Sequence, residues 1–380
     1  MTRPGQIALA ALAALLIPPG LAKAADAATP PKPHRPQEEA IAAAPLPYRE
    51  EIVVFDNPAA PGVKLAGTLT LPKGAGPFAP ILLIAGSGKN DRDETLAKGA
   101  DHKPMLVLAD ALTRQGYAVL RYDKRGVGQS TGDVAAATMA DSISDAAAAL
   151  AYLRRRPEVD AARLGLIGHS EGGDIAAILG VRDPSLAYVV SMAGGAVPFK
   201  LLVAEQTRLM EIAQGKAPAE ATRSYNLNLR LFDAIAAAKD RADAEARVGQ
   251  VVAATHPEPA KADVDQAMLY ARLPYMRFIL AADPTPALRQ LRVPILVLEG
   301  SKDLIGPPDL NLPAMRKALA RDRDVTIVEL PGLNHFFQPA QTGLPEEFAK
   351  IDVTLAPEVM TTLFPWIAKH TAAAEPRSAR

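Results

Sequence analysis

A serine stands among glycines in the stretch GHSEGG, where Ser170 follows the apolar segment RLGLIG and precedes an amphipathic segment. A G-x-S-x-G pattern between a strand and a helix is typical of a sharp turn that presents a nucleophilic hydroxyl. Such a turn needs small residues, because side chains at positions 168 and 172 would collide with the backbone. Ser170 is therefore our candidate nucleophile, with Gly168 and Gly172 as the glycines of its turn.

A serine hydroxyl is a poor nucleophile at neutral pH and needs a general base, for which histidine is the commonest choice. The chain has six histidines, which are His34, His102, His169, His256, His335 and His370. His335, in ELPGLNHFF, follows the last predicted strand and precedes the last predicted helix. That position can reach the carboxyl edge of a parallel sheet, where reactive groups gather. We expect His335 to be the base, and His102, in the loop after an early strand, stays as an alternative.

An imidazole base needs a carboxylate that fixes its tautomer and stabilises the imidazolium. Asp303, in VPILVLEGSKD, comes just after the penultimate predicted strand and is our candidate. Asp309 lies further into the same loop and is the alternative.

A serine nucleophile also needs two N–H donors for the oxyanion of the tetrahedral intermediate. The backbone N–H of Glu171, directly after the nucleophile, is one candidate, and that of Ser87, in the loop AGSG, is the other. We expect the side chain of Glu171 to point away from the reaction, toward Arg92 or Arg125.

Other motifs do not point to a cofactor. AGSGKN lacks the first glycine and the final Ser or Thr of a phosphate-binding loop, and GVGQSTG has one residue too many for a dinucleotide fingerprint. No H-E-x-x-H, histidine cluster or EF-hand loop is present, so we expect no metal ion and no other cofactor.

The elements that must position these residues alternate between strand and helix. YREEIVVF and VKLAGTLTL predict a hairpin, and the apolar run APILLIAG predicts a buried strand. Helix MLVLADALTRQG, strand YAVLRYD, helix MADSISDAAAALAYLRRR, strand RLGLIG, helix GGDIAAILGV and strand LAYVVSMAG follow. This order predicts the α/β class, with a mostly parallel central sheet covered by helices on both faces.

The strand pattern disappears over residues 197–291, which are rich in alanine and predict a helical insertion. Strands return at VPILVLEG and VTIVELPG, and PEVMTTLFPWIAKH predicts a final helix. The sheet domain therefore comprises residues 48–196 and 292–370. Six large side chains of the insertion are candidates for a substrate pocket, although ordinary core packing is the more frequent role of such residues: Tyr225, Phe232, Tyr270, Tyr275, Met276 and Phe278.

Residues 1–24 have the features of an export signal, with Arg3 before an apolar run and AKA before the expected cleavage point. We therefore expect a periplasmic or secreted protein without integral membrane association after signal removal. Residues 25–47 are rich in proline and alanine and predict a disordered spacer, and residues 371–380 predict a tail.

Lys plus Arg and Asp plus Glu both number 42, and this balance argues against nucleic acid as a partner. The chain has no cysteine, which excludes disulfides and a thiol nucleophile.

Together these motifs resemble the α/β-hydrolase superfamily, whose nucleophile–acid–histidine order matches Ser170, Asp303 and His335. GYAVLRYDKRGVGQSTG resembles the serine-aminopeptidase-like and monoglyceride-lipase-like branch, and GSGKNDRDET, GHSEGG and LPGLNHFFQ resemble exported bacterial esterases of that branch. The resemblance implies an α/β-hydrolase fold with the insertion at 197–291 as a helical cap. Relatives often carry His-Gly where this chain has AGSG, and the difference falls in the loop expected to bind the oxyanion.

Three functions compete on these residues. A serine hydrolase that cleaves small-molecule carboxylic esters through an acyl-enzyme is the first. A serine aminopeptidase on the same three residues is the second, and it would need an acidic cap site such as Glu205, Glu211 or Glu220. A non-catalytic binding protein on this fold is the third, which an intact nucleophile, acid and base disfavour. The oligomeric state is not indicated.

Overall fold

A computed structural model describes residues 33–97, 99–255 and 261–372. The predicted export signal lies outside these residues, as does the predicted tail apart from its first two residues, and both stay predictions. No helix in the described ranges is both long enough and apolar enough to cross a membrane.

The centre of the molecule is one eight-stranded sheet with the strand order β1-β2-β4-β3-β5-β6-β7-β8. Its strands are β1 (Tyr48–Asp56), β2 (Lys64–Pro72), β3 (Pro80–Ile84), β4 (Ala118–Tyr122), β5 (Gly165–His169), β6 (Tyr188–Met192), β7 (Ile295–Gly300) and β8 (Val325–Leu330). Strand β2 is antiparallel to both of its neighbours, and the pairs from β4 to β8 are parallel. The predicted hairpin and the mostly parallel sheet are both confirmed.

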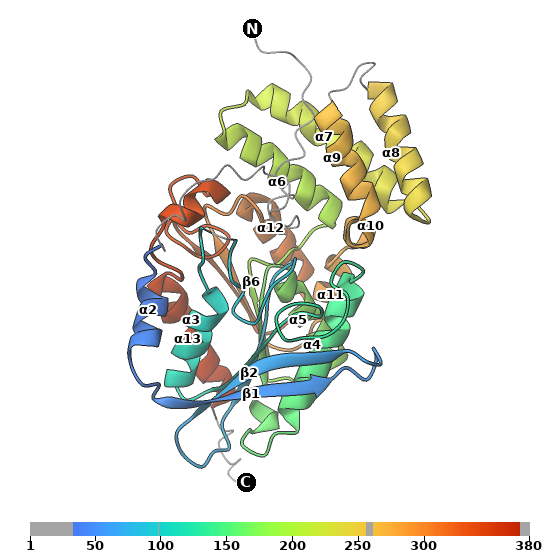
Figure 1. Cartoon of the computed structure of the whole chain (residues 1–380). Coiled ribbons are helices and arrows are strands. Elements are labelled where there is room, and N and C mark those ends of the chain that lie inside the picture. Colours follow the sequence, from blue (N-terminus) through green and yellow to red (C-terminus); the bar gives the residue numbers. More distant parts are fainter. Residues whose placement is uncertain (1–32, 98, 256–260, 373–380) are drawn as a thin grey trace, which may run out of the picture.

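Helices cover both faces of this sheet (Figure 1). On one face lie α3 (Pro104–Arg114) and α13 (Pro357–Thr371), and on the other lie α4 (Met139–Arg154) and α5 (Glu171–Arg182). The residues of β3 alternate between them, since Ile81 and Leu83 pack with α3 and α13 while Leu82 and Ile84 pack with α4 and α5. This alternation follows from the two-residue period of a strand, so each apolar strand contributes side chains to the cores on both faces of the sheet.

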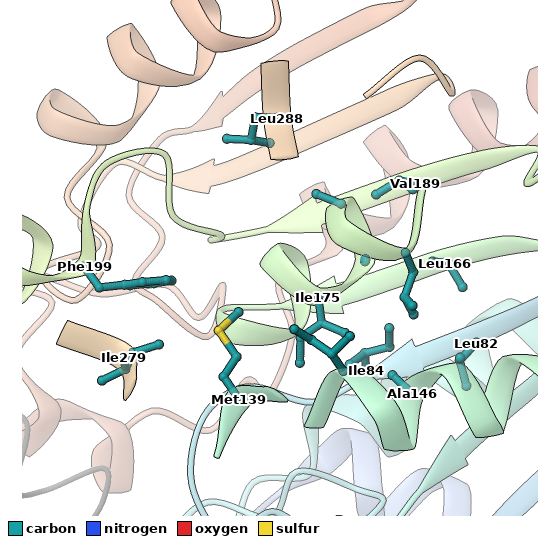
Figure 2. Packing of buried hydrophobic residues seen from close by; sticks show 14 of the residues in the cluster. Leu82, Ile84, Met139, Ala146, Leu166, Ile175, Val189, Phe199, Ile279 and Leu288 are labelled. Carbon is teal, nitrogen blue, oxygen red and sulfur yellow. The ribbon is translucent and has the colours of Figure 1, made fainter. Parts of the chain in front are cut away.

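Among its described residues, the range without a strand pattern forms six helices between β6 and β7. They are α6 (Phe199–Ala213), α7 (Pro218–Ala236), α8 (Arg241–Thr255), α9 (Lys261–Arg272), α10 (Pro274–Ala281) and α11 (Thr285–Gln290). Helices α6 to α9 stand together at one end of the molecule, above the sheet (Figure 1). Phe199 and Ile279 belong to the same apolar cluster as Met139 and Ile175, so the cap and the sheet domain share a core (Figure 2).

The sheet domain also has two short 3-10 helices and one further α-helix: η1 (Ala161–Arg163), η2 (Pro345–Lys350) and α12 (Pro308–Ala318). The prediction did not assign α12, which follows β7 and begins with proline.

The predicted spacer differs from the structure in its second half, where Pro36–Ala43 forms helix α2. Arg35 is 4% exposed, and its Nε donates to the carbonyl oxygen of Ala100 at 2.7 Å. Gln37 Oε1 accepts hydrogen bonds from the backbone N–H of Thr354 and of Leu355. The composition of the segment predicts disorder, but these long-range polar contacts dock it on the sheet domain, and local composition does not reveal them.

We predict that Arg35→Ala lowers the free energy of unfolding by about 1.5–3 kcal/mol, because the buried carbonyl of Ala100 loses a charged donor. Urea denaturation of both proteins measures the difference. His34→Ala is the control, since the His34 side chain is 63% exposed and its removal should change stability by about 0.5 kcal/mol or less. Equal effects of the two substitutions would contradict the docking of α2.

Candidate active site

The predicted site residues meet at the carboxyl edge of the parallel strands. Ser87 follows β3, Ser170 follows β5, Asp303 follows β7 and His335 follows β8. These strands are close neighbours in the sheet, with only β6 inserted between β5 and β7. Ser170, His335 and Ser87 line one cavity of about 60 Å³, which we call the Ser170 cavity.

The turn at Ser170 has a strained backbone. Ser170 has φ 53° and ψ −123°, in a region that side-chain-bearing residues rarely adopt. A Cβ at Gly168 would overlap the carbonyl oxygen of Gly172, and a Cβ at Gly172 would overlap the carbonyl oxygen of Ile84 in β3. The two predicted glycines are therefore required by contacts within the turn and with the neighbouring strand. The turn leaves Ser170 half-buried on the wall of its cavity.

His335 and Asp303 form a buried pair. His335 Nδ1 lies 2.7 Å from Asp303 Oδ2, and the side chains are 4% and 0% exposed. The other carboxylate oxygen of Asp303 accepts the backbone N–H groups of Ile305 and Gly306, both at 2.7 Å. Burial alone would raise the pKa of Asp303, but the charge and hydrogen bond of His335, together with these backbone donors, lower it. An ionised Asp303 keeps a proton on Nδ1 and leaves Nε2 free to accept one.

The alternatives for these two roles lie elsewhere. Asp309 is exposed in the first turn of α12. His102 is fully buried, with Nδ1 2.6 Å from Thr354 Oγ1 and Nε2 3.0 Å from the carbonyl oxygen of Phe348. His256 lies outside the described residues. No hydrogen bond joins Ser170 to His335 in this structure, and such contacts often tighten only when substrate binds.

The loop after β3 approaches the nucleophile turn closely. A Cβ at Gly86 would lie 3.2 Å from Cβ of Ser170, so glycine permits this approach. Asn90 Nδ2 donates to the carbonyl oxygens of Gly86 and Ser87, and these bonds hold the loop at both residues. Within the described ranges the N–H of Ser87 has no protein acceptor, and the N–H of Glu171 is the first of its helix, where intrahelical acceptors are lacking. Both N–H groups are thus available beside Ser170.

A buried ion pair behind the site was not anticipated from the sequence. Glu94 Oε1 accepts hydrogen bonds from the N–H of Gly86 at 2.6 Å and from His169 Nδ1 at 2.9 Å. His169 Nε2 donates to the carbonyl oxygen of His335 at 2.9 Å. Burial opposes the charged imidazolium, but the nearby carboxylate of Glu94 outweighs it and raises the pKa of His169. This Glu94–His169 pair links the loops that carry Ser87, Ser170 and His335.

The predicted partners of the Glu171 side chain are wrong. Glu171 accepts a hydrogen bond from Lys124 Nζ at 2.9 Å and from the hydroxyl of Tyr275 at 3.2 Å. Arg92 pairs with Asp123 at 2.6 Å, and Arg125 pairs with Asp141 and Asp145. The two arginines are unavailable because their planar guanidinium groups bind these other carboxylates.

The cap contributes a different set of side chains to the Ser170 cavity from the one proposed. Of the six candidates only Tyr275 lines it, whereas Phe232, Tyr270 and Met276 are buried in the core. The cap side of the cavity is formed by Phe199, Leu202, Val203, Gln206, Tyr275 and Ile279. The four α6 residues have the i, i+3, i+4, i+7 spacing of one helical face, but this spacing does not separate a cavity from a core, because Phe199 and Val203 also belong to the apolar core.

Comparisons with known proteins identify the family of this chain. The family model described as serine aminopeptidase, S33, matches residues 103–337, a range that contains Ser170, Asp303 and His335. Among curated proteins, the chain is similar to esterase EstD of Thermotoga maritima, with 25% identity over 288 residues that cover 75% of this chain and 61% of the relative. The chain therefore spans about three fifths of the length of that relative.

Solved structures show the likeness in fold. The structure of DcsB in complex with its substrate analogue has a TM-score of 0.52 at 16% identity and covers 86% of this chain and 100% of that one. The α/β hydrolase GrgF from Penicillium sp. sh18 has a TM-score of 0.50 at 14% identity, with coverage of 86% and 100%. At these identities the likeness concerns the fold alone.

We predict that the Glu94–His169 pair makes stability depend on pH. Because the folded-state pKa of His169 is raised, its contribution is fully present below the unfolded pKa of about 6.5 and is lost as pH rises through the folded value. Glu94→Gln should lower the free energy of unfolding by about 3–5 kcal/mol at mildly acidic pH. The difference between the two proteins should shrink at alkaline pH. Urea denaturation over a pH series measures both.

Asp324→Asn is the matched control, since it removes a carboxylate that contacts His370 at 3.1 Å but is 38% exposed. Its effect should be about 1 kcal/mol or less, because solvent screens the exposed pair. A pH-independent effect of Glu94→Gln, or one no larger than that of Asp324→Asn, would contradict the assigned ion pair.

Proposed function

Because this chain belongs to the serine aminopeptidase S33 family of α/β-hydrolases, we propose that it cleaves carboxylic esters through an acyl-enzyme formed on Ser170. The observation that carries the proposal is the buried hydrogen bond between His335 Nδ1 and Asp303, at the cavity that Ser170 also lines. The 25% identity to an esterase supports the choice of esters.

In the proposed mechanism, His335 Nε2 takes the proton of Ser170 as its Oγ attacks the ester carbonyl carbon. Asp303 holds the imidazole and stabilises the imidazolium. The N–H groups of Ser87 and Glu171 bind the oxyanion of the tetrahedral intermediate. The alcohol leaves with the proton from His335, and water then attacks the acyl-enzyme by the same steps to release the acid and free Ser170.

Release of N-terminal amino acids is the second candidate, favoured by the description of the family model. It would need a carboxylate for the substrate ammonium group. Of the three cap carboxylates considered, none lines the Ser170 cavity; Glu205 pairs with Arg208, Glu211 with Lys216 and Glu220 with Arg223. These pairings oppose the three cap carboxylates as the binding site for a substrate ammonium group.

We predict that Ser170→Ala abolishes hydrolysis of p-nitrophenyl acetate while the protein stays folded, because no other hydroxyl replaces the nucleophile. A panel of p-nitrophenyl esters beside aminoacyl p-nitroanilides separates the two candidate functions. Circular dichroism of the variant controls for unfolding. Hydrolysis retained by Ser170→Ala would contradict the assignment of Ser170 as the nucleophile. A preference for the aminoacyl p-nitroanilides would favour aminopeptidase activity.

We predict that Asp303→Asn lowers kcat by about 10⁴-fold, since an amide at this position favours the wrong imidazole tautomer. Asp309→Asn is the matched control from the same loop, and it should leave kcat within about twofold because Asp309 is exposed. A loss of less than tenfold in Asp303→Asn would remove Asp303 from the proposed mechanism.

A further inference from the structure

Two buried polar atoms on the wall of the Ser170 cavity have no protein partner. Asp174 and Gln206 are 4% and 2% exposed, and both line the cavity. Among the described residues, no hydrogen-bond partner exists for Asp174 Oδ2 or Gln206 Nε2. Most of the surrounding wall is apolar and comprises Ala193, Phe199, Leu202, Val203, Ile279 and Ile305. The mechanism proposed above uses neither polar group.

The two groups come from different parts of the fold. Asp174 lies one turn after Ser170 on α5, and its Oδ1 accepts the N–H of Gly195 at 2.9 Å. That hydrogen bond fixes the carboxyl group through Oδ1, and the second oxygen, Oδ2, stays without a protein partner among the described residues. Gln206 lies on α6 of the cap, so the sheet domain and the cap each supply one polar group to the same cavity.

A buried polar group without a partner lowers stability by about 1–3 kcal/mol. Leucine or methionine would fill such a place in an apolar wall without that penalty. A polar pair in an otherwise apolar site typically binds a matching group of the ligand and orients it.

Resting on the ester hydrolysis proposed above, we propose that Asp174 and Gln206 bind a hydroxyl group on the acyl part of the substrate. The hydroxyl oxygen accepts one hydrogen bond from Gln206 Nε2 and a second from Oδ2 of Asp174, which carries the proton of the neutral acid because Oδ1 accepts the N–H of Gly195. We assign the pair to the acyl part because only that part stays attached to Ser170, one turn away on the same helix, through both half-reactions.

The charge state of Asp174 favours a hydroxyl over an ammonium group. Burial, together with the neighbouring charge of Glu171, raises the pKa of Asp174 well above its ordinary value despite the N–H of Gly195. A neutral acid matches a neutral hydroxyl, whereas an ammonium group would require ionisation of Asp174. Side chains one helical turn apart are about 5–6 Å apart at Cβ, so the hydroxyl should lie only a few carbon atoms from the ester carbonyl. A 3-hydroxybutyryl ester is the probe that fits this spacing.

The test compares kcat/KM for p-nitrophenyl 3-hydroxybutyrate and p-nitrophenyl butyrate. We expect the wild-type protein to prefer the hydroxylated ester by about tenfold or more, the factor that one net hydrogen bond supplies. Gln206→Met, which keeps the length of the side chain, should reduce the tenfold preference for the hydroxylated ester to about threefold or less. Asp174→Leu, which removes the O–H donor, should also reduce it, whereas Asp174→Asn, whose Nδ2 can donate in its place, should retain it.

Thr207→Val is the matched control on α6. Thr207 is as buried as Asp174, but its hydroxyl donates to the carbonyl oxygen of Val203 and does not line the cavity. The substitution should leave the preference for the hydroxylated ester unchanged. An equal loss in Thr207→Val and Gln206→Met would mean that the effect comes from the packing of the helix, and it would overturn the assignment.

Binding tests the pair without catalysis. In Ser170→Ala, calorimetry should give a Kd about tenfold lower for 3-hydroxybutyrate than for butyrate, and addition of Gln206→Met should remove the difference. Equal hydrolysis and equal binding of the two would overturn the hydroxyl site while ester hydrolysis stands. A preference for esters with a hydroxyl group on the alcohol part, or with an ammonium group on the acyl part, would also overturn the hydroxyl site. If no ester is hydrolysed, the proposed function fails, and the binding comparison alone decides this inference.

Discussion

The backbone contact between Gly172 and the carbonyl oxygen of Ile84 is the constraint on which the rest of the site depends. The contact allows the first turn of α5 to pack on the end of β3. Ser170, which connects β5 to α5, adopts its strained conformation at this turn. The same approach brings Gly86 within contact of Ser170 and therefore places the N–H of Ser87 beside the turn. Strain of this kind persists only where the surrounding structure enforces it, and here two buried strands do so.

Buried charges hold the loops around that turn. The Glu94–His169 pair joins the loop after β3 to the backbone of His335, and Lys124 joins Glu171 to the carbonyl oxygen of Gly86. Buried ion pairs are weak contributors to net stability, because desolvation offsets their attraction. Their value in this site is positional, since Glu94 and Lys124 bind the backbone of Gly86 and His169 binds the backbone of His335.

The cap completes the cavity instead of merely covering it. Helix α10 supplies Tyr275, which binds Glu171 next to the nucleophile, and α6 supplies Gln206 and an apolar wall. Phe199 and Ile279 also belong to the core that contains Ile175 of α5 (Figure 2). Because the cap and the nucleophile helix share a core, substitutions in the cap will affect both substrate choice and the position of the turn.

The sequence by itself determined the sheet, its helical layers and the ends of the strands at which Ser170, Asp303 and His335 lie. Apolar periodicity and glycine placement carry that information, because they reflect burial and backbone sterics that act locally. Only the tertiary structure decided the partners of Glu171, the Glu94–His169 pair, the docking of α2 and the presence of Asp174 and Gln206 on the wall of one cavity. These contacts join residues that are far apart along the chain, or side chains whose direction depends on how whole helices pack, and neither spacing nor composition specifies such geometry.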